Sequence, residues 1–251
     1  MAHFAAYPDD DPDAYRVKRR SSRRASSGAW TLKVVTTCLA IAGLMAIGDF
    51  AMSWSRAIAD AEGRVADGMP IALFVGDQRL SIPANMFRFA DQRSVGPHDH
   101  VELAVHWPTL EGYSPALRDA FVDPGDSAPV LYLSIRTRTT VTDSAGRLAS
   151  VYRHFMDEDA LPAPPGLVAR RLTADSGLAG EEVYFEAGST DPFTLHCLAA
   201  DGRDYPALCM TEVHAGTGLS VQLRFRKGLL EDWAAIKDAT RLLLLRFGVV
   251  S

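Results

Sequence analysis

Residues 218–247 have the sequence GLSVQLRFRKGLLEDWAAIKDATRLLLLRF, in which the hydrophobic period changes once. Up to Arg226, apolar and polar residues alternate, which predicts a strand with one dry and one wet face. From Leu229 to Phe247 the apolar residues recur at helical spacing instead. Acidic residues begin this segment and arginines end it, an order that suits the helix dipole. The stretch therefore predicts a strand and then an amphipathic helix that packs on the dry face of a sheet.

Strand patterns precede this stretch along most of the chain. In the second half, short turns rich in Gly, Asp and Pro separate candidate strands near residues 167–172, 181–187, 193–199, 207–214 and 218–226. Strands joined by such turns are typical of an antiparallel meander. In the first half, period-two patterns typical of strands occur near residues 71–75, 101–107 and 131–136. We expect an α+β fold, with an antiparallel β-meander and a C-terminal amphipathic helix packed on the sheet.

An uncharged apolar stretch lies near the N-terminus, where residues 34–48 have the sequence VVTTCLAIAGLMAIG. Alone it is shorter than the roughly 20 residues that a transmembrane helix needs. Lys33 can extend towards the headgroups, and Trp30 and Trp54 favour the interface, so the longer segment suffices. We expect residues 30–54 to form a single transmembrane signal-anchor helix, with the lipid bilayer as its partner.

The charges around this segment predict its orientation. Basic residues gather before it: Arg16, Lys18, Arg19, Arg20, Arg23, Arg24 and Lys33. The positive-inside rule then places residues 1–29 in the cytoplasm and the C-terminal part in the periplasm of a bacterium, outside the inner membrane. The alternative is a cleavable signal peptide, because Ala57-Ile58-Ala59 has the small-x-small form of a cleavage site. That site lies well beyond the apolar core, which favours the anchor.

The remaining chain divides at changes in composition. Residues 1–29 are polar and basic and are expected to be disordered. Residues 55–68 predict a helical stalk, residues 69–160 a β-rich exported lobe and residues 166–251 the meander with its helix. A Pro-rich break separates the two lobes, and whether they share one core stays open. Acidic residues outnumber basic ones beyond Trp54, so we do not expect nucleic acid as a partner.

Two cysteines are placed to form a disulfide. Cys197 and Cys209 flank a stretch that contains Asp201-Gly202 and Pro206, which favour a turn. A hairpin centred there sets the cysteines opposite each other, at a distance that a disulfide spans. Such a bond persists outside the cytoplasm. A redox-active pair is the minor alternative, because the Cys-x-x-Cys spacing that lowers a thiol pKa is absent.

One segment suggests metal binding. His98, His100, Glu102 and His106 are all even-numbered, so a strand projects them from one face. Imidazole and carboxylate groups together bind zinc or copper. However, positions four apart on a strand lie about 13 Å from each other, too far to share one ion. Ordinary polar residues on a wet face are the favoured interpretation.

Four arginines suggest an anion-binding patch. Arg136 and Arg138 share the wet face of one predicted strand, and Arg224 and Arg226 share that of another. If these strands are neighbours, their guanidinium groups form a surface for carboxylate or phosphate groups of a partner. The alternative is that each arginine pairs with local acids.

The sequence contains no established catalytic motif. It has no nucleophile elbow, zinc-protease motif or phosphate-binding glycine loop, and no cofactor is expected. The acidic run Asp157-Glu158-Asp159 is interpreted as a solvated linker. The favoured function is a membrane-tethered, non-enzymatic binding or accessory domain that contacts another envelope protein or membrane complex. The alternatives are an exported enzyme or metal-binding protein that uses the His98–His106 segment, and a transmembrane sensor with a cytoplasmic partner.

Overall fold

The computed structural model describes residues 33–48, 50, 63–178, 180–198 and 206–249. The chain divides into two compact units, Met1–Arg56 and Ala57–Ser251. In the first unit, residues 33–48 are helical and their side chains are exposed. Among the described residues, no helix has both the length and the hydropathy that crossing a bilayer requires. The anchor expected at residues 30–54 lies partly outside the described residues and stays a prediction.

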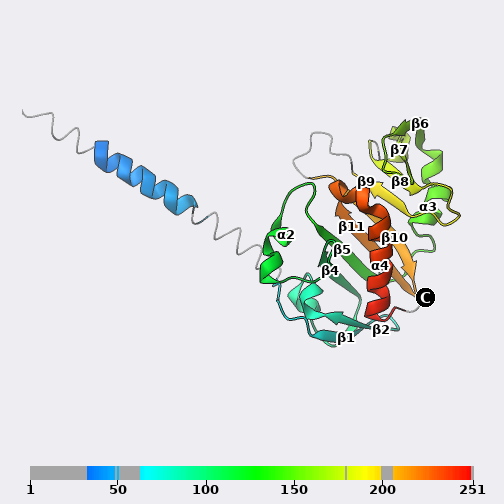
Figure 1. The fold of residues 1–251 in the computed structure, drawn as a ribbon, viewed down its shortest axis with the longest axis horizontal. Coiled ribbons are helices and arrows are strands. Elements are labelled where there is room, and N and C mark those ends of the chain that lie inside the picture. Colours follow the sequence, from blue (N-terminus) through cyan, green and yellow to red (C-terminus); the bar gives the residue numbers. More distant parts are fainter. Residues whose placement is uncertain (1–32, 49, 51–62, 179, 199–205, 250–251) are drawn as a thin grey trace, which may run out of the picture. The chain divides into compact units, whose positions relative to one another are not determined.

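The second unit is built on an eight-stranded antiparallel sheet (Figure 1). Its strands follow the spatial order β4, β5, β11, β10, β9, β8, β7, β6. From β6 to β11 each strand pairs with the next one along the chain, which confirms the predicted meander. The strands are β4 (His100–His106), β5 (Val130–Thr137), β6 (Met156–Leu161), β7 (Leu167–Leu172), β8 (Glu182–Glu186), β9 (Thr194–Cys197), β10 (Leu208–Ala215) and β11 (Leu219–Arg226).

Helix α4 (Trp233–Phe247) covers one face of this sheet, as the change of hydrophobic period predicts (Figure 1). A 3₁₀ helix, η6 (Lys227–Asp232), joins β11 to α4, so the α-helix begins four residues later than the first apolar residue of the pattern. Gly248 ends it with a left-handed φ of 94°, and its N–H caps the last turn. The residues of α4 that are buried are Trp233, Ile236, Thr240, Leu243, Leu244 and Phe247.

A second sheet of three strands completes the same hydrophobic core. Its spatial order is β2, β1, β3, in which β1 pairs antiparallel with β2 and parallel with β3. Leu73 and Ile82 from this sheet belong to one buried cluster with Leu103 of β4 and Leu223 of β11. The two expected lobes therefore share one core. The strands are β1 (Pro70–Val75), β2 (Gln78–Pro83) and β3 (Gly96–His98).

Two short helices lie on the opposite face of the eight-stranded sheet. Phe121 anchors α2 (Arg118–Val122) in a small hydrophobic cluster with residues of β4 and β5. Leu148 anchors α3 (Ser144–Ser150) in another cluster with residues of β7 and β8. The N-terminus of α3 also reaches β10, because the Glu212 N–H donates to Ser144 Oγ at 2.9 Å.

The acidic run that was interpreted as a linker is a strand. Asp157, Glu158 and Asp159 lie in β6, which pairs with β7 at the edge of the sheet. Their side chains are exposed. Charged residues are common on edge strands because they oppose pairing with other chains. An exposed edge strand and a solvated linker thus have the same composition, and only the pairing distinguishes them.

The predicted stalk helix does not extend through residues 63–68. These residues have no regular secondary structure, and Gly63 adopts a left-handed φ of 59°. A glycine in that conformation interrupts a helix at low cost, which gives the physical reason for the difference. Residues 55–62 of the expected stalk, and residues 1–29 of the expected tail, lie outside the described residues.

Candidate functional site

Strands β9 and β10 pair over a short distance and then separate. They are in register at two positions only, Cys209↔Cys197 and Met210↔His196. Beyond Met210 the place of β9 beside β10 is taken by Ser144 Oγ, which accepts the N–H of Glu212 at 2.9 Å. The rest of β10, from Glu212 to its end, keeps its partner β11 on one side and has no strand on the other.

This separation leaves part of the β10 main chain open. In an antiparallel ladder, successive residues direct their N–H and C=O groups to opposite sides. The Glu212 N–H points to Ser144, away from β11, so the N–H and C=O of His214 and the C=O of Glu212 point the same way. In the part of the chain that the structure describes, the main chain of His214 has no hydrogen-bond partner on that side. We call this segment, residues 212–215, the open edge.

A pocket of about 300 Å³ lies beside the open edge. On one side it reaches the core face of β10 and helix α4, and on the other it reaches Asp143 at the start of α3. Its apolar wall is formed by Phe193, Leu223 and Leu244, all buried. Leu245 lies on α4 at the rim of the pocket, and this large apolar side chain is 52% exposed. Apolar walls beside polar main-chain groups are typical of binding pockets.

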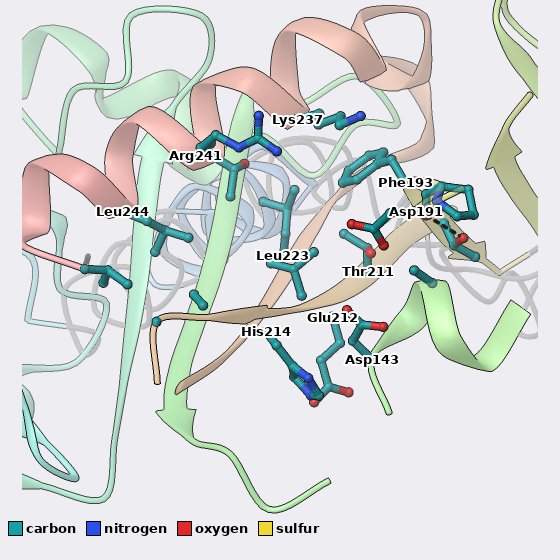
Figure 2. A pocket seen from close by; sticks show the side chains of 18 of the residues that line it. Asp143, Asp191, Phe193, Thr211, Glu212, His214, Leu223, Lys237, Arg241 and Leu244 are labelled. Atoms are coloured by element: carbon teal, nitrogen blue, oxygen red, sulfur yellow. Dashed lines mark hydrogen bonds between the residues drawn. The ribbon is translucent and has the colours of Figure 1, made fainter. Parts of the chain in front are cut away.

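Figure 2 shows how the labelled side chains divide around β10. Thr211 and Asp191 lie on the side that faces α4, whereas Glu212 and His214 lie on the opposite side, as alternation along a strand requires. The pocket therefore wraps around the open edge, with main-chain groups in its middle.

Two buried polar groups in the pocket have no partner among the described residues, Thr211 Oγ1 and His214 Nε2. Thr211 is 2% exposed, and its Oγ1 forms no hydrogen bond to any described residue. A buried hydroxyl without a partner costs on the order of 1–3 kcal/mol. By contrast, Thr240 also lines the pocket, but its hydroxyl donates to the Ile236 carbonyl at 2.8 Å. Thr211 is thus the hydroxyl that a ligand can satisfy.

The charged groups of the pocket differ in how far they are already paired. On α4, Lys237 Nζ donates to Glu186 at 2.7 Å. This hydrogen bond holds the pKa of Glu186 below its ordinary value, against a smaller opposing effect of burial. Arg241, one turn further along α4, has no ion pair with a described residue, and neither has Asp191. Arg241 and Asp191 are the charges that remain available for a ligand.

Glu212 holds the base of the open edge in place. Its carboxylate accepts hydrogen bonds from Arg147 on α3, from Ser220 on β11 at 2.5 Å and from Thr140 at 3.3 Å. Burial alone raises the pKa of this carboxyl, but the hydrogen bonds from Ser220 and Arg147 outweigh it and leave the pKa lowered. The carboxylate is therefore a fixed structural anion and ties α3 to β10.

Two of the acidic groups near the open edge are already bound within the fold. The Asp143 carboxylate accepts the Gly146 N–H at 3.0 Å as the N-cap of α3, and the Glu212 carboxylate is bound to Arg147. The site offers main-chain hydrogen bonding, an apolar wall and the charges of Arg241 and Asp191.

The predicted disulfide is present at the paired end of β10. Cys197 and Cys209 are directly opposed, with their Cα atoms 4.0 Å apart, and both are fully buried in the main core. The bond thus closes β9 on β10 next to the point where the strands separate. Residues 199–205 of the connecting turn lie outside the described residues. Cys38, the remaining cysteine, is not in a disulfide.

The four arginines lie on or next to two neighbouring strands of the sheet, but they do not form a single patch. Strands β5 and β11 are neighbours, as the proposed patch requires. Their antiparallel register sets Arg136 opposite Ser220 and Arg224 opposite Tyr132. The two sites are four residues apart on β11, which is about 13 Å. The arginines thus form two pairs at opposite ends of the strands.

Local groups occupy most of these arginines. Arg224 forms a salt bridge with Glu102 at 3.0 Å, although its Nε is buried without a partner. Arg226 Nε is likewise buried without a partner. The other two donate to polar groups nearby: Arg136 to Ser134 Oγ at 3.1 Å and Arg138 to the Thr217 carbonyl at 3.1 Å.

The four candidate metal ligands are likewise dispersed. His98 lies in β3 of the small sheet, whereas the other three lie in β4. Glu102 is bound to Arg224, and the two outer histidines bond locally, His98 to the Ser94 carbonyl at 3.0 Å and His106 to Thr109 Oγ1 at 2.9 Å. No group of three or more His, Cys, Asp and Glu side chains within the described ranges is arranged to hold a metal ion.

Sequence patterns did not indicate the pocket. Thr211, His214 and Arg241 stand in segments that were correctly expected to be strand and helix, and their types are ordinary there. One signal was available: Asp191-Pro192 precedes β9, and a proline at that point cannot donate to a neighbouring strand. It is consistent with a short β9, but it does not reveal which strand loses its partner.

Comparisons with known proteins locate the fold. No protein-family model matches the chain, and no curated protein has significant sequence similarity to it. An immunity protein of the Stenotrophomonas maltophilia type IV secretion system has a similar solved structure, with a TM-score of 0.51 and 16% identity over 72% of this chain and 94% of that one. The iron-regulated outer membrane lipoprotein FrpD of Neisseria meningitidis gives a TM-score of 0.48 and 14% identity, over 74% of this chain and 95% of that one. At these identities, the comparison with the immunity protein shows a likeness of fold: this chain has an α+β fold with a large antiparallel sheet and a C-terminal helix.

Proposed function

We propose that this protein is a membrane-tethered, non-enzymatic binding domain of the bacterial cell envelope, which contacts another envelope protein through the pocket and the open edge of β10. The observation that carries the proposal is the open edge itself. Unpaired main-chain groups beside an apolar pocket are a binding surface for another chain and have no role in the packing of this one.

The chemistry around the pocket supports binding over catalysis. The nearby carboxylates Asp143 and Glu212 are bound within the fold. The lining groups without a partner among the described residues are Thr211 Oγ1, His214 Nε2, Arg241 and Asp191, and in the proposed role they recognise a ligand. The fold that the chain shares with a secretion-system immunity protein is compatible with a role at the envelope, and at 16% identity it specifies no function.

Two features support the location. The predicted anchor, residues 30–54, follows a basic segment, which favours an exported C-terminal part. The disulfide between Cys197 and Cys209 suits an oxidising compartment such as the periplasm. A tether also raises the effective concentration of the domain towards partners in the same membrane.

Protease protection tests the location. In spheroplasts whose inner membrane is intact, a C-terminal epitope tag on the full chain is expected to be digested, and an N-terminal tag is expected to be protected. Membrane fractionation is expected to leave the chain in the membrane after a carbonate wash. A protected C-terminal tag, or a mature chain in the soluble fraction that begins near Asp60, contradicts the proposed tether.

Site-specific crosslinking in intact cells tests the binding surface. A photo-reactive amino acid at Leu245, which is 52% exposed at the pocket rim, is expected to give one discrete adduct with an envelope protein. The matched control is Val95, which is 79% exposed and lies outside the pocket. The same adducts at both positions, or none at Leu245, contradict binding through this pocket.

A further inference from the structure

We propose that the occupant of the site is an extended peptide segment of the partner, which adds to the open edge of β10 as a further strand, places one apolar side chain in the pocket and directs a carboxylate to Arg241. This inference rests on the proposed function, because it names the part of the partner that the domain recognises. It assigns recognition to main-chain groups of the open edge and to side chains of the pocket.

The main-chain geometry supports strand addition. The Glu212 C=O and the N–H and C=O of His214 lie on one side of β10, in the pattern that a neighbouring strand completes. Ser144 already occupies the Glu212 N–H, so an added strand begins beyond that point. The open edge therefore accepts a short segment, and the pairing of β10 with β11 stays intact.

The pocket selects an apolar side chain at one position of that segment. Side chains of an added strand alternate between the two faces of the sheet, and those on the face of α4 point at Leu223 and Leu244. The exposed Leu245 lies at the rim of the same pocket, where it gains cover from the segment. A pocket of about 300 Å³ accommodates a large aliphatic or aromatic group.

The Thr211 hydroxyl gives an independent argument for an occupant. It lines the pocket, is almost fully buried and has no hydrogen-bond partner among the described residues. The fold bears the cost of this unsatisfied group in the unbound state. A polar group of an added segment within the pocket removes that cost.

Charge complementarity identifies the flanking side chain. Lys237 forms an ion pair with Glu186, whereas Arg241, one turn away on α4, has no ion pair within the described residues. A carboxylate near α4 therefore gains a charge-assisted hydrogen bond from Arg241. Asp191, which lies on the same side of β10, repels a second carboxylate placed next to it. The expected segment is extended and apolar at its centre, and it carries a single carboxylate, which lies beside Arg241.

The probe for the test is a synthetic library of acetylated, amidated hexapeptides in which the four central positions vary. The full chain, reconstituted in nanodiscs, is screened at peptide concentrations up to about 1 mM, so that weak binding is also detected. The expected binders alternate in polarity, contain one large apolar residue and carry one acidic side chain. Failure to retain any hexapeptide overturns the proposal, as does selection of binders without a carboxylate.

Backbone methylation of the best binder tests strand addition without changing the protein. N-methyl groups on alternate residues in one register remove the donors that face β10 and are expected to weaken binding at least tenfold. The same number of N-methyl groups in the other register is the matched control and is expected to have little effect. Hydrogen exchange of the His214 N–H is expected to slow with the unmodified peptide and with the control peptide, and to stay unchanged with the peptide that is methylated at the donors facing β10. Equal affinities in both registers rule out strand addition.

A charge swap tests the role of Arg241 independently of folding. Arg241→Glu is expected to lower the affinity for the acidic peptide at least tenfold and to raise it for a peptide with lysine in place of the acid. Loss of binding to both peptides contradicts the assignment of the carboxylate.

The two proposals fail in different ways. If Leu245 crosslinks to a partner in cells but hexapeptides do not bind, the binding function stands and the extended segment is wrong. If the adducts at Leu245 and Val95 are the same and the hexapeptides still bind, the open edge accepts strands but the proposed function is wrong. If a free amino acid or another small molecule slows exchange of the His214 N–H as much as the peptide does, the extended segment is also wrong.

Discussion

The two ends of β10 differ although they belong to one strand. At the first end, Cys209 and Met210 are paired with β9, and a buried disulfide holds the pairing. At the other end, residues 212–215 have lost that neighbour and line a pocket. The core extends under both ends, since Leu223 and Phe225 of β11 are fully buried. A strand can thus be held by its packing and one neighbour while its other edge remains open to a partner.

The largest loss of stability is expected when the buried side chains of β11 that lie beside the two ends of β10 are truncated. Phe225→Ala, opposite Cys209, is expected to lower the free energy of unfolding by about 3–5 kcal/mol. Leu223→Ala, opposite Thr211, is expected to cost about 2–3 kcal/mol, near the low end for such truncations, because Leu223 already borders the pocket and loses fewer contacts. Urea unfolding of the full chain in mild detergent measures both. A larger loss for Leu223→Ala removes the distinction between the two ends.

The disulfide provides the next test of the paired end. Replacing Cys197 and Cys209 by serine is expected to destabilise the domain by about 3 kcal/mol, because the bond closes a short loop in the unfolded chain. Cys38→Ser is the matched control, since Cys38 is not bonded, and its free energy of unfolding is expected to be unchanged. If the double variant unfolds at the same urea concentration as the control, the disulfide does not stabilise the paired end.

Glu212 marks the boundary between the two ends. Glu212→Gln weakens three hydrogen bonds of the carboxylate and is expected to cost on the order of 2 kcal/mol. The pKa of Glu212 is below its ordinary value of 4.5 in the folded state, so its contribution is complete above that value and is lost as the pH falls through the folded pKa. The plot of unfolding free energy against pH is expected to be shallower in acid for the variant. Parallel plots contradict this account.

A comparison of Thr211 with Thr240 tests whether the Thr211 hydroxyl is unsatisfied in the free protein. Thr211→Val replaces an unsatisfied hydroxyl by a methyl group of similar size and is expected to stabilise the domain by about 1 kcal/mol. Thr240→Val is the control, because it removes a hydroxyl that already has a partner, and no gain in stability is expected. Thermal unfolding measures both. A loss of stability for Thr211→Val shows that its hydroxyl is already satisfied in the free protein.

The smallest change in stability is expected for a substitution of Arg241, because this side chain has no structural role. Arg241→Ala is expected to change the free energy of unfolding by less than about 0.5 kcal/mol, as is usual for exposed side chains. Lys237→Ala, which loses the bond to Glu186, is expected to cost somewhat more. Urea unfolding of both variants checks the order. A larger loss for Arg241→Ala indicates an ion pair within the fold.

The sequence by itself determined the last strand, the C-terminal helix and the pairing of two cysteines that lie close together in the chain. Alternation along Leu219–Arg226 and helical spacing after it specify a strand and a helix, because each period leaves one apolar side to bury. The pairing of Cys197 with Cys209 follows from the turn between them. These are local properties, in which neighbours along the chain decide the outcome.

Only the tertiary structure decided which strand edges pair with a neighbour and which remain unpaired. The register of β5 and β11 separates Arg136 from Arg224, although both are wet-face residues. β6 has the composition of a linker but pairs at the sheet edge. The open edge exists because Ser144, from a distant segment, takes the place of β9 beside Glu212. Such choices depend on which segments pack together across the sheet, and period and composition do not encode them.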